Sequence, residues 1–251
     1  GLILMGSCDW NDGFSKLGEK GEGVSIWLAF FAAESLSLFS QICEISSRED
    51  LAAKFREYAK TLVDAAKNSW DGDRFIRAIT DSGLVLGAKN SPVFEIDSIA
   101  QSFSWFVEST DKEFSDKREI ALNTALRLLW DKNRGVCKLF DRPVTDRSLG
   151  YISDYPSGVR ENGGQYTHAA IWLAIACFKA GRADDGYGIL KDIIDVGYTE
   201  NYEGESFVIA ADVSDKGRCG WSWYTGSAGW FRRAVLEYML GIRLEMGVLR
   251  V

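Results

Sequence analysis

Apolar residues recur every three to four positions along much of the chain, which is the pattern of amphipathic or buried α-helices. The first such stretch predicts a helix over roughly 23–45, and the second predicts one over about 48–69. Ser47 is suited to cap the second helix, and Glu49 and Asp50 fall in its first turn, where the helix dipole favours anions. The same spacing predicts further helices over about 96–109, 116–130, 166–180, 183–195 and 227–240.

The stretches between these helices differ in length and character. Residues 70–92 are turn-rich and predict a hairpin. Residues 131–163 and 196–224 show no sustained period, and loops of that length inside a compact domain are usually functional. Gly181 and Gly241 follow predicted helices and are suited to end them.

This order of elements indicates the fold class. Helix pairs alternate with tight turns and long polar loops, and strand-like stretches are few. The pattern favours an all-α fold, a helical toroid whose long active-site loops gather at one end. The predicted helices would form about half to two-thirds of an (α/α)6 barrel. A solenoid is disfavoured because no repeat of fixed length is visible.

Composition narrows the function classes. The net charge of −7 argues against a nucleic-acid partner. The longest uninterrupted apolar stretches, 26–33 and 171–178, are far shorter than the roughly 20 residues of a membrane span, so we expect no membrane span. No signal peptide is visible. The five scattered cysteines include no CxxC pair, which argues against a zinc site and fits reduced thiols in a cytoplasmic protein.

Nine tryptophans are the most unusual feature of the composition. They could fill a large core, or some could line a sugar site, since flat indole rings stack on the apolar faces of pyranose rings. Four polar clusters that combine carboxylates, aromatic residues and glycines support the interpretation as a sugar site. They are "CDWNDG" (8–13), "EIDSIAQS" (95–102), "YPSGVRENGGQYTH" (155–168) and "GWSWYTGSAGW" (220–230).

The first cluster contains a candidate proton donor. Glycosidic bond cleavage needs a carboxylic acid that stays protonated near neutral pH, which burial beside an indole can achieve. Asp12, two residues after Trp10, fits that description. The alternative is that Asp9, Asn11 and Asp12 form only an Asx turn before Gly13.

The last two clusters contain a candidate anion site. His168 is the sole histidine and starts an apolar helix; it could be a hydrogen-bonded core residue or an anion ligand. Thr225 and Ser227 supply hydroxyl groups, and Gly226 supplies an unhindered N–H at a predicted helix start. A helix N-terminus of this kind can bind phosphate, although an ordinary Ser/Thr cap has the same composition.

Taken together, the clusters resemble the glycoside phosphorylases of glycoside hydrolase family 94, which include cellobiose, cellodextrin and chitobiose phosphorylases. The family also includes the phosphorylase-like module of cyclic β-1,2-glucan synthases. Family hallmarks are the stretches that stand here as "CDWNDG", "IDSIAQS", "YPSGVRENGGQYTHA" and "SWYTGSAGW". The matches run in order over almost the whole chain.

The resemblance implies a role for residues of three of these clusters. Asp12 would be the catalytic general acid, with Trp10 beside it in the glycosyl subsite. The remaining implied residues bind phosphate or substrate, with Asp9 and Gln165 in supporting positions. They are His168, Thr225, Gly226 and Ser227 for phosphate, and Tyr155, Arg160, Glu161, Asp9 and Gln165 for the substrate.

The implied reaction is inverting phosphorolysis. Asp12 would protonate the bridging oxygen while inorganic phosphate attacks the anomeric carbon from the opposite face, giving an α-sugar 1-phosphate. Because phosphate is already an anion, one acid and an anion site suffice where a hydrolase needs two carboxylates. We therefore expect a β-linked oligosaccharide and phosphate as substrates, and no cofactor or metal.

The chain departs from the family in its length. Family members carry additional β-sandwich domains and early barrel helices, and a phosphate-binding arginine lies upstream of this region. We therefore expect 1–244 to be a partial catalytic barrel and 245–251 to be the start of a missing C-terminal β-sandwich. Such a fragment would have little activity alone, and missing segments or a partner chain would complete the barrel.

The substrate branch and two rival functions are left open. "FVIAADV" (207–213) and "WYTGSAGW" look more like the β-1,2-glucan members than the cellobiose members. One rival is an inverting hydrolase that uses Glu161 as a base, roughly 6.5–9.5 Å from Asp12. The other is a non-catalytic sugar-binding remnant, which an exposed apolar edge along the helices near either terminus would favour.

Overall fold

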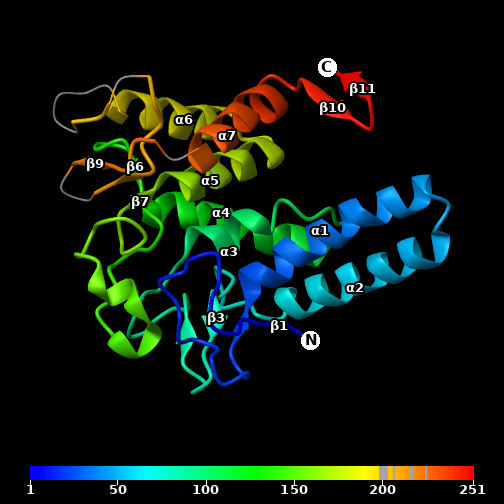
Figure 1. Cartoon of the computed structure of the whole chain (residues 1–251), viewed down its shortest axis with the longest axis horizontal. Helices are drawn as coiled ribbons and strands as arrows, with labels where there is room; N and C mark the ends of the chain where they lie inside the picture. Colours follow the sequence, from blue (N-terminus) through cyan, green and yellow to red (C-terminus); the bar gives the residue numbers. More distant parts are fainter. Residues whose placement is uncertain (198–202, 206, 215–216, 224) are drawn as a thin grey trace.

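A computed structural model describes residues 1–197, 203–205, 207–214, 217–223 and 225–251 of the chain (Figure 1). The described part is mainly helical, and its helices fall close to the predicted ranges. They are α1 (Ile26–Ile45), α2 (Glu49–Lys67), α3 (Ser98–Phe103), α4 (Lys112–Leu129), α5 (Thr167–Lys179), α6 (Ala183–Gly197) and α7 (Thr225–Arg233), which continues as a π-helical turn, Ala234–Met239.

Two helix predictions need correction. The helix predicted over 96–109 is only α3, because the chain turns tightly after Phe103 through hydrogen bonds from the Trp105 and Phe106 amides to the carbonyls three residues earlier. Ser47 does not cap α2. It lies at φ 55° in the turn that ends α1, where its amide donates to the Glu44 carbonyl oxygen, and α2 starts without a side-chain cap.

The predicted ends of two other helices are confirmed. Gly181 follows α5 at φ 74°, and Gly241 follows the last helical turn at φ 76°. Both backbones are in the left-handed region that glycine enters without a Cβ clash.

The all-α expectation is only partly met, because short antiparallel strands tie the loops together. Four strands form one sheet in the order β1-β2-β3-β4, and this sheet includes the hairpin predicted within 70–92. The strands of this sheet are β1 (Ile3–Leu4), β2 (Val24–Ser25), β3 (Ala78–Ile79) and β4 (Val85–Leu86).

The other strands form three small sheets, which lie in or beside the two long irregular tracts and after the last helix. One sheet pairs β5 (Trp130–Asp131) with β6 (Val136–Cys137), and another pairs β10 (Arg243–Glu245) with β11 (Val248–Arg250). The third has the order β7 (Gln165–Tyr166), β8 (Asp212–Val213) and β9 (Cys219–Gly220). Two 3₁₀ turns, Arg147–Leu149 and Tyr151–Asp154, complete the first tract.

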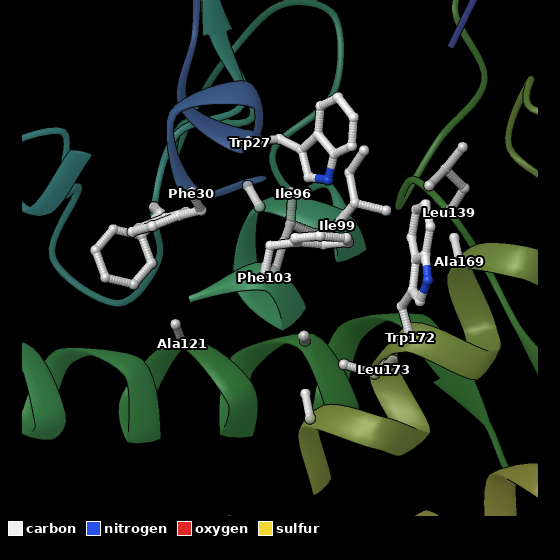
Figure 2. Close-up of a cluster of buried hydrophobic side chains, with 14 of the residues drawn as sticks. Trp27, Phe30, Ile96, Ile99, Phe103, Ala121, Leu139, Ala169, Trp172 and Leu173 are labelled. Carbon is white, nitrogen blue, oxygen red and sulfur yellow. The ribbon is translucent and has the colours of Figure 1, made fainter. Parts of the chain in front are cut away.

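The core lies where α3 and α5 meet α1 and α4. Figure 2 shows Trp27 of α1, Phe103 of α3 and Trp172 of α5 gathered with smaller apolar side chains, with Phe30 of α1 to one side. Phe103 and Trp172 pack edge to face with ring centroids 4.8 Å apart. Because α5 lies at the centre of this packing, the polar loop at its N-terminus is held firmly against the core.

Helix α1 also bears on membrane topology. It meets the length and hydropathy criteria for a membrane span, as the core helix of a globular domain also can. The sequence expectation of no span was based on uninterrupted apolar stretches, whereas α1 is apolar as a whole despite its serines and Glu34. Its Trp27, Phe30 and Ala33 are buried in the protein core, and 39% of its apolar window is buried in all.

The helices pack as pairs, with α1 against α2 and α5 against α6 (Figure 1). This is the arrangement expected of a segment of an (α/α)6 barrel, although the closed barrel stays a prediction. The β10–β11 hairpin lies apart from the core, and every residue in its strands is exposed.

Candidate active site

The loop that contains Asp12 is a compact turn closed by its own side chains. The Asn11 amide donates to Asp9 Oδ1 at 3.2 Å, and the Gly13 amide donates to Asn11 Oδ1 at 3.2 Å. The predicted Asx turn is therefore present. Asn11 and Gly13 are buried, whereas the side chain of Asp12 between them is exposed. The expectation that Asp12 is buried beside the indole is wrong for this reason.

Trp10 joins this loop to the start of α5. Its ring centroid lies 5.3 Å from that of Tyr166 and 5.7 Å from that of His168, in edge-to-face contacts, and 4.9 Å from that of Trp172. Residues separated by about 160 positions are therefore in contact, and the loop of Asp12 lies beside the only histidine of the chain.

The start of α7 meets the same histidine. A Cβ atom added at Gly226 would lie 3.5 Å from His168 Cε1 and 3.6 Å from Nδ1, so the backbone of Gly226 faces the imidazole directly. Ser227 is buried beside it. Thr225 begins α7, but its side chain is outside the described part of the chain. The structure thus brings together the lone histidine and the first turn of a helix.

Burial controls the charge of His168. It lowers the pKa of the imidazole to about 4, so the ring is neutral at pH 7 and one nitrogen carries a proton. Its Nε2 is buried and makes no hydrogen bond within the described chain. A neutral ring with an unpaired nitrogen at a helix N-terminus can accommodate an anion.

The loop at 155–161 supplies a charged pair to this region. Arg160 Nε lies 3.2 Å from Glu161 Oε2, and the Arg160 guanidinium lies over the Tyr155 ring at 4.7 Å and over the Trp221 ring at 5.0 Å. Burial raises the pKa of Glu161, Arg160 lowers it, and Asp12 raises it through charge repulsion. That repulsion places Asp12 in the electrostatic neighbourhood of Glu161.

Gln165 and Asp9 are interior rather than surface residues. Gln165 Oε1 accepts a hydrogen bond from the Cys137 amide at 2.7 Å, which joins β7 to β6. The Asp9 side chain is fully covered and pairs with the buried Arg77. Both residues tie loops together, and a contact of either with the substrate stays a prediction.

Unpaired polar atoms concentrate in this region. Twelve buried side-chain polar atoms among the described residues make no hydrogen bond. Since buried polar groups are nearly always satisfied, such a cluster marks where a polar ligand could bind. Nine of the twelve belong to Asp9, Asn11, Arg160, Glu161, Gln165, Thr167, His168, Trp172 and Asp212.

Sequence reasoning missed three residues of this site. Trp172 lies four positions after His168 on α5, and the ring centroids are 4.3 Å apart, so the i, i+4 rule could have found it. Tyr166 precedes the helix, and burial raises its pKa to about 12. Asp212 is opposite Tyr166 in the β7–β8 pair, and no local signal links it to the site.

Two other observations concern metal binding and the position of the site. Among the described residues, no cluster of three or more His, Cys, Asp or Glu side chains could hold a metal ion. A cavity of about 930 Å³ lies elsewhere, between α1, α2 and residues 105–111. None of the predicted site residues lines it. The candidate site is instead the region where these residues meet around His168.

Comparison with known proteins identifies the family of this chain. Residues 1–241 match the model of the Glycosyl hydrolase 94 superfamily catalytic domain. The chain therefore belongs to this family of glycoside phosphorylases and related enzymes.

Curated relatives cover nearly the whole chain. The cyclic beta-(1,2)-glucan synthase NdvB of Rhizobium meliloti is 39% identical over 97% of this chain and 9% of its own length. Cellobionic acid phosphorylase of Neurospora crassa is 29% identical over 97% of this chain and 32% of its own. N,N'-diacetylchitobiose phosphorylase of Vibrio furnissii is 26% identical over 97% and 31%. The chain thus spans about a third or less of these relatives.

A solved structure described as a sialidase shares the fold. It matches with a TM-score of 0.63 at 14% identity, over 97% of this chain and 22% of its own. At this identity the likeness concerns the fold alone.

Proposed function

We propose that this chain carries the proton donor and the phosphate subsite of an inverting glycoside phosphorylase. The observation that supports the proposal most strongly is that His168 has two neighbours. On one side it contacts Trp10, which lies on the loop of Asp12, and on the other it faces Gly226 at the start of α7. Inverting phosphorolysis requires a proton donor and an anion on opposite faces of one sugar ring, and these contacts bring the loop of Asp12 and the start of α7 to the same histidine.

In the proposed reaction, a sugar ring lies against Trp10 with its glycosidic oxygen next to Asp12. Asp12 donates its proton to that oxygen, the bond from the anomeric carbon to the oxygen breaks, and the acceptor sugar leaves as an alcohol. A phosphate oxygen forms the new bond to the anomeric carbon from the opposite face. The proton that phosphate then loses restores Asp12 to its acid form, so the step is balanced without a cofactor.

The site residues divide between the two substrates. His168, Gly226 and Ser227, with Thr225 at the start of α7, would hold phosphate at the helix N-terminus. Tyr155, Arg160 and Glu161 would contact sugar hydroxyl groups, and Glu161 Oε2, which is ion-paired with Arg160 but makes no hydrogen bond, could accept one from a sugar hydroxyl. The bound sugar would also cover the exposed Asp12.

The proposed substrate is a β-linked glucan or oligosaccharide, with a β-1,2 linkage favoured. The support is the 39% identity to a protein named as a cyclic β-1,2-glucan synthase, above the 29% identity to a named cellobionic acid phosphorylase. Asp12 and His168 would serve any β-linkage, because they act on the glycosidic oxygen and on phosphate.

Inorganic phosphate itself provides the first test. Since His168 is the sole histidine, its Hε1 nucleus gives a single NMR signal from a known place in the site. We expect titration with phosphate to shift this signal saturably, and substitution Ser227→Ala to weaken the binding. A signal that does not respond to phosphate would refute the phosphate subsite.

A second test separates phosphorolysis from hydrolysis. The hydrolase alternative needs a free carboxylate as base, and Glu161 is already paired with Arg160. We expect a β-1,2-glucan to yield sugar 1-phosphate only when phosphate is added, however low the rate. Release of free reducing sugar at the same rate without phosphate would favour the hydrolase.

A further inference from the structure

A fully buried arginine links the loop of Asp12 to the rest of the fold. Arg77 Nε donates to Asp97 Oδ2 at 2.9 Å, its Nη1 donates to Ser25 Oγ at 2.9 Å, and its Nη2 donates to Asp9 Oδ1. The three partners come from the N-termini of α3 and α1 and from the loop at 8–13. One guanidinium therefore joins three segments far apart in the sequence.

The end of this network at α3 is rigid. Asp97 caps α3 by accepting from the Ile99 amide at 2.7 Å. Gln101 of the same helix exchanges two hydrogen bonds with the backbone of Phe75, each 2.9 Å long, and so holds the segment just before Arg77. The "IDSIAQS" stretch, for which the proposed reaction has no direct use, thus fixes both the backbone and the side chain of this region.

The other end of the network reaches both neighbours of Asp12. Asp9 Oδ1, which Arg77 holds, also accepts from the Asn11 amide, and Asn11 Oδ1 accepts from the Gly13 amide. The backbone is therefore tied on either side of Asp12, while the Asp12 side chain itself stays exposed.

The charge of the network argues for a geometric role. Although burial favours the neutral form, the carboxylates of Asp9 and Asp97 raise the pKa of Arg77, so the arginine stays charged. Burial raises the pKa of Asp97 to about 6 despite the nearby Arg77, and a buried ion network is poor evidence for added stability. Such networks are better suited to fixing one arrangement of the chain.

We infer that Arg77 is a positioning residue that fixes the proton-donor loop through Asp9 and Asn11. The inference rests on the proposed function only for the role of Asp12; the tether itself is a property of the fold. Lysine cannot replace Arg77, because one ammonium group cannot reach three partners in the directions that the planar guanidinium does.

The test compares two tether variants with a matched control. Arg77→Lys keeps the charge, and Asp9→Asn leaves the Arg77–Asp97 pair in place. The control is Asp81→Asn: Asp81 accepts from the Lys20, Glu22 and Gly23 amides and so ties down the same N-terminal segment without touching the loop of Asp12.

The measured quantities are amide hydrogen exchange and the His168 signal. We expect Arg77→Lys and Asp9→Asn to speed exchange at Asn11 and Gly13 by about tenfold relative to the slowest amides of α5. They should also shift the His168 Hε1 signal, because Trp10 moves relative to the imidazole. Asp81→Asn should speed exchange only near residues 20–23.

The double variant Arg77→Lys/Asp9→Asn tests whether Arg77 acts on the loop of Asp12 through Asp9. If Arg77 acts through Asp9, exchange at Asn11 and Gly13 in the double variant equals that in Arg77→Lys alone. Unchanged exchange in both single variants, or an equal rise in the control, would overturn the inference. The phosphate titration of the unsubstituted chain reports on the proposed function separately, so the two failures are distinguishable.

Discussion

At the scale of single residues, exposure decides what a substitution at Asp12 should do. The side chain is exposed, so Asp12→Asn should change the free energy of unfolding by less than about 0.5 kcal/mol. The same substitution removes the proposed proton donor and should lower residual phosphorolysis by about 10²–10⁴-fold. The control is Asp184→Asn, which removes an exposed carboxylate in the first turn of α6; it should leave phosphorolysis unchanged and cost about 0.3–1 kcal/mol through the helix dipole.

His168 sets a pH dependence of stability. Burial lowers its pKa in the folded state to about 4, from a usual value of 6.5, so the folded chain favours the neutral ring. The stabilisation is therefore fully present above pH 6.5 and is lost as the pH falls toward 4. At about 1.4 kcal/mol per pKa unit, the loss reaches up to about 3 kcal/mol.

Denaturant unfolding at a series of pH values measures this loss, with His168→Gln as the comparison. The variant should lose less stability between pH 6.5 and 4 than the unsubstituted chain. Identical pH profiles for the two proteins would mean that another group titrates in this window.

At the scale of elements, the loop of Asp12 packs against the 3₁₀ turns at 147–154 through Gly150. This glycine has φ 125°, and an added Cβ would lie 2.3 Å from the Gly13 carbonyl oxygen and 2.5 Å from the Ser15 amide nitrogen. Gly83, in the β3–β4 turn, also has a positive φ, 81°, but open space around it. The two glycines therefore separate backbone strain from a steric clash.

We expect Gly83→Ala to cost about 1–2 kcal/mol of unfolding free energy, which is the strain of the left-handed backbone. Gly150→Ala should cost at least about 3 kcal/mol, because the clash forces the loop of Asp12 to move. It should also shift the His168 signal, which Gly83→Ala should not. Equal costs for the two variants would argue against close packing at Gly150.

The elements themselves were predicted better than their ends. Periodicity located every α-helix among the described residues, since a buried stripe at 3.6 spacing is a local property of the sequence. It overextended α3, because Trp105, Phe106 and Val107 are buried in a turn rather than on a helix face. Apart from the β3–β4 hairpin, the short strands were missed because two-residue pairings depend on partners such as Tyr166 and Asp212 that are distant in sequence.

At the scale of the whole molecule, α1 presents an apolar stripe to solvent. Phe31, Leu38, Ile42 and Ile45 follow helical spacing on one face and are 44–67% exposed. The segment after α7 also exposes large apolar side chains, among them Leu240 and Leu244. An apolar edge near the termini is the feature that would favour a non-catalytic remnant that binds sugar or associates with a partner, and monomers rarely expose such patches.

We therefore expect the chain alone to self-associate and to have little phosphorolytic activity. Size-exclusion chromatography should give an apparent mass above 28.0 kDa, and the variant Leu38→Gln/Ile42→Gln should lower it. Tyr187→Gln, an exposed aromatic residue on α6, is the control. Monomeric behaviour of the unsubstituted chain, or robust phosphorolysis by it, would contradict this expectation.

The sequence by itself determined the helices, the family motifs and the residue types of the site, because these depend on local spacing and on short runs of residues. Only the tertiary structure decided which groups meet. Trp10 contacts His168, Gly226 faces the same imidazole, and Arg77 joins Asp9 to Asp97. It also turned Asp12 outward, against the expectation of burial. Such contacts join segments far apart in the chain, and no local pattern encodes the packing that brings them together.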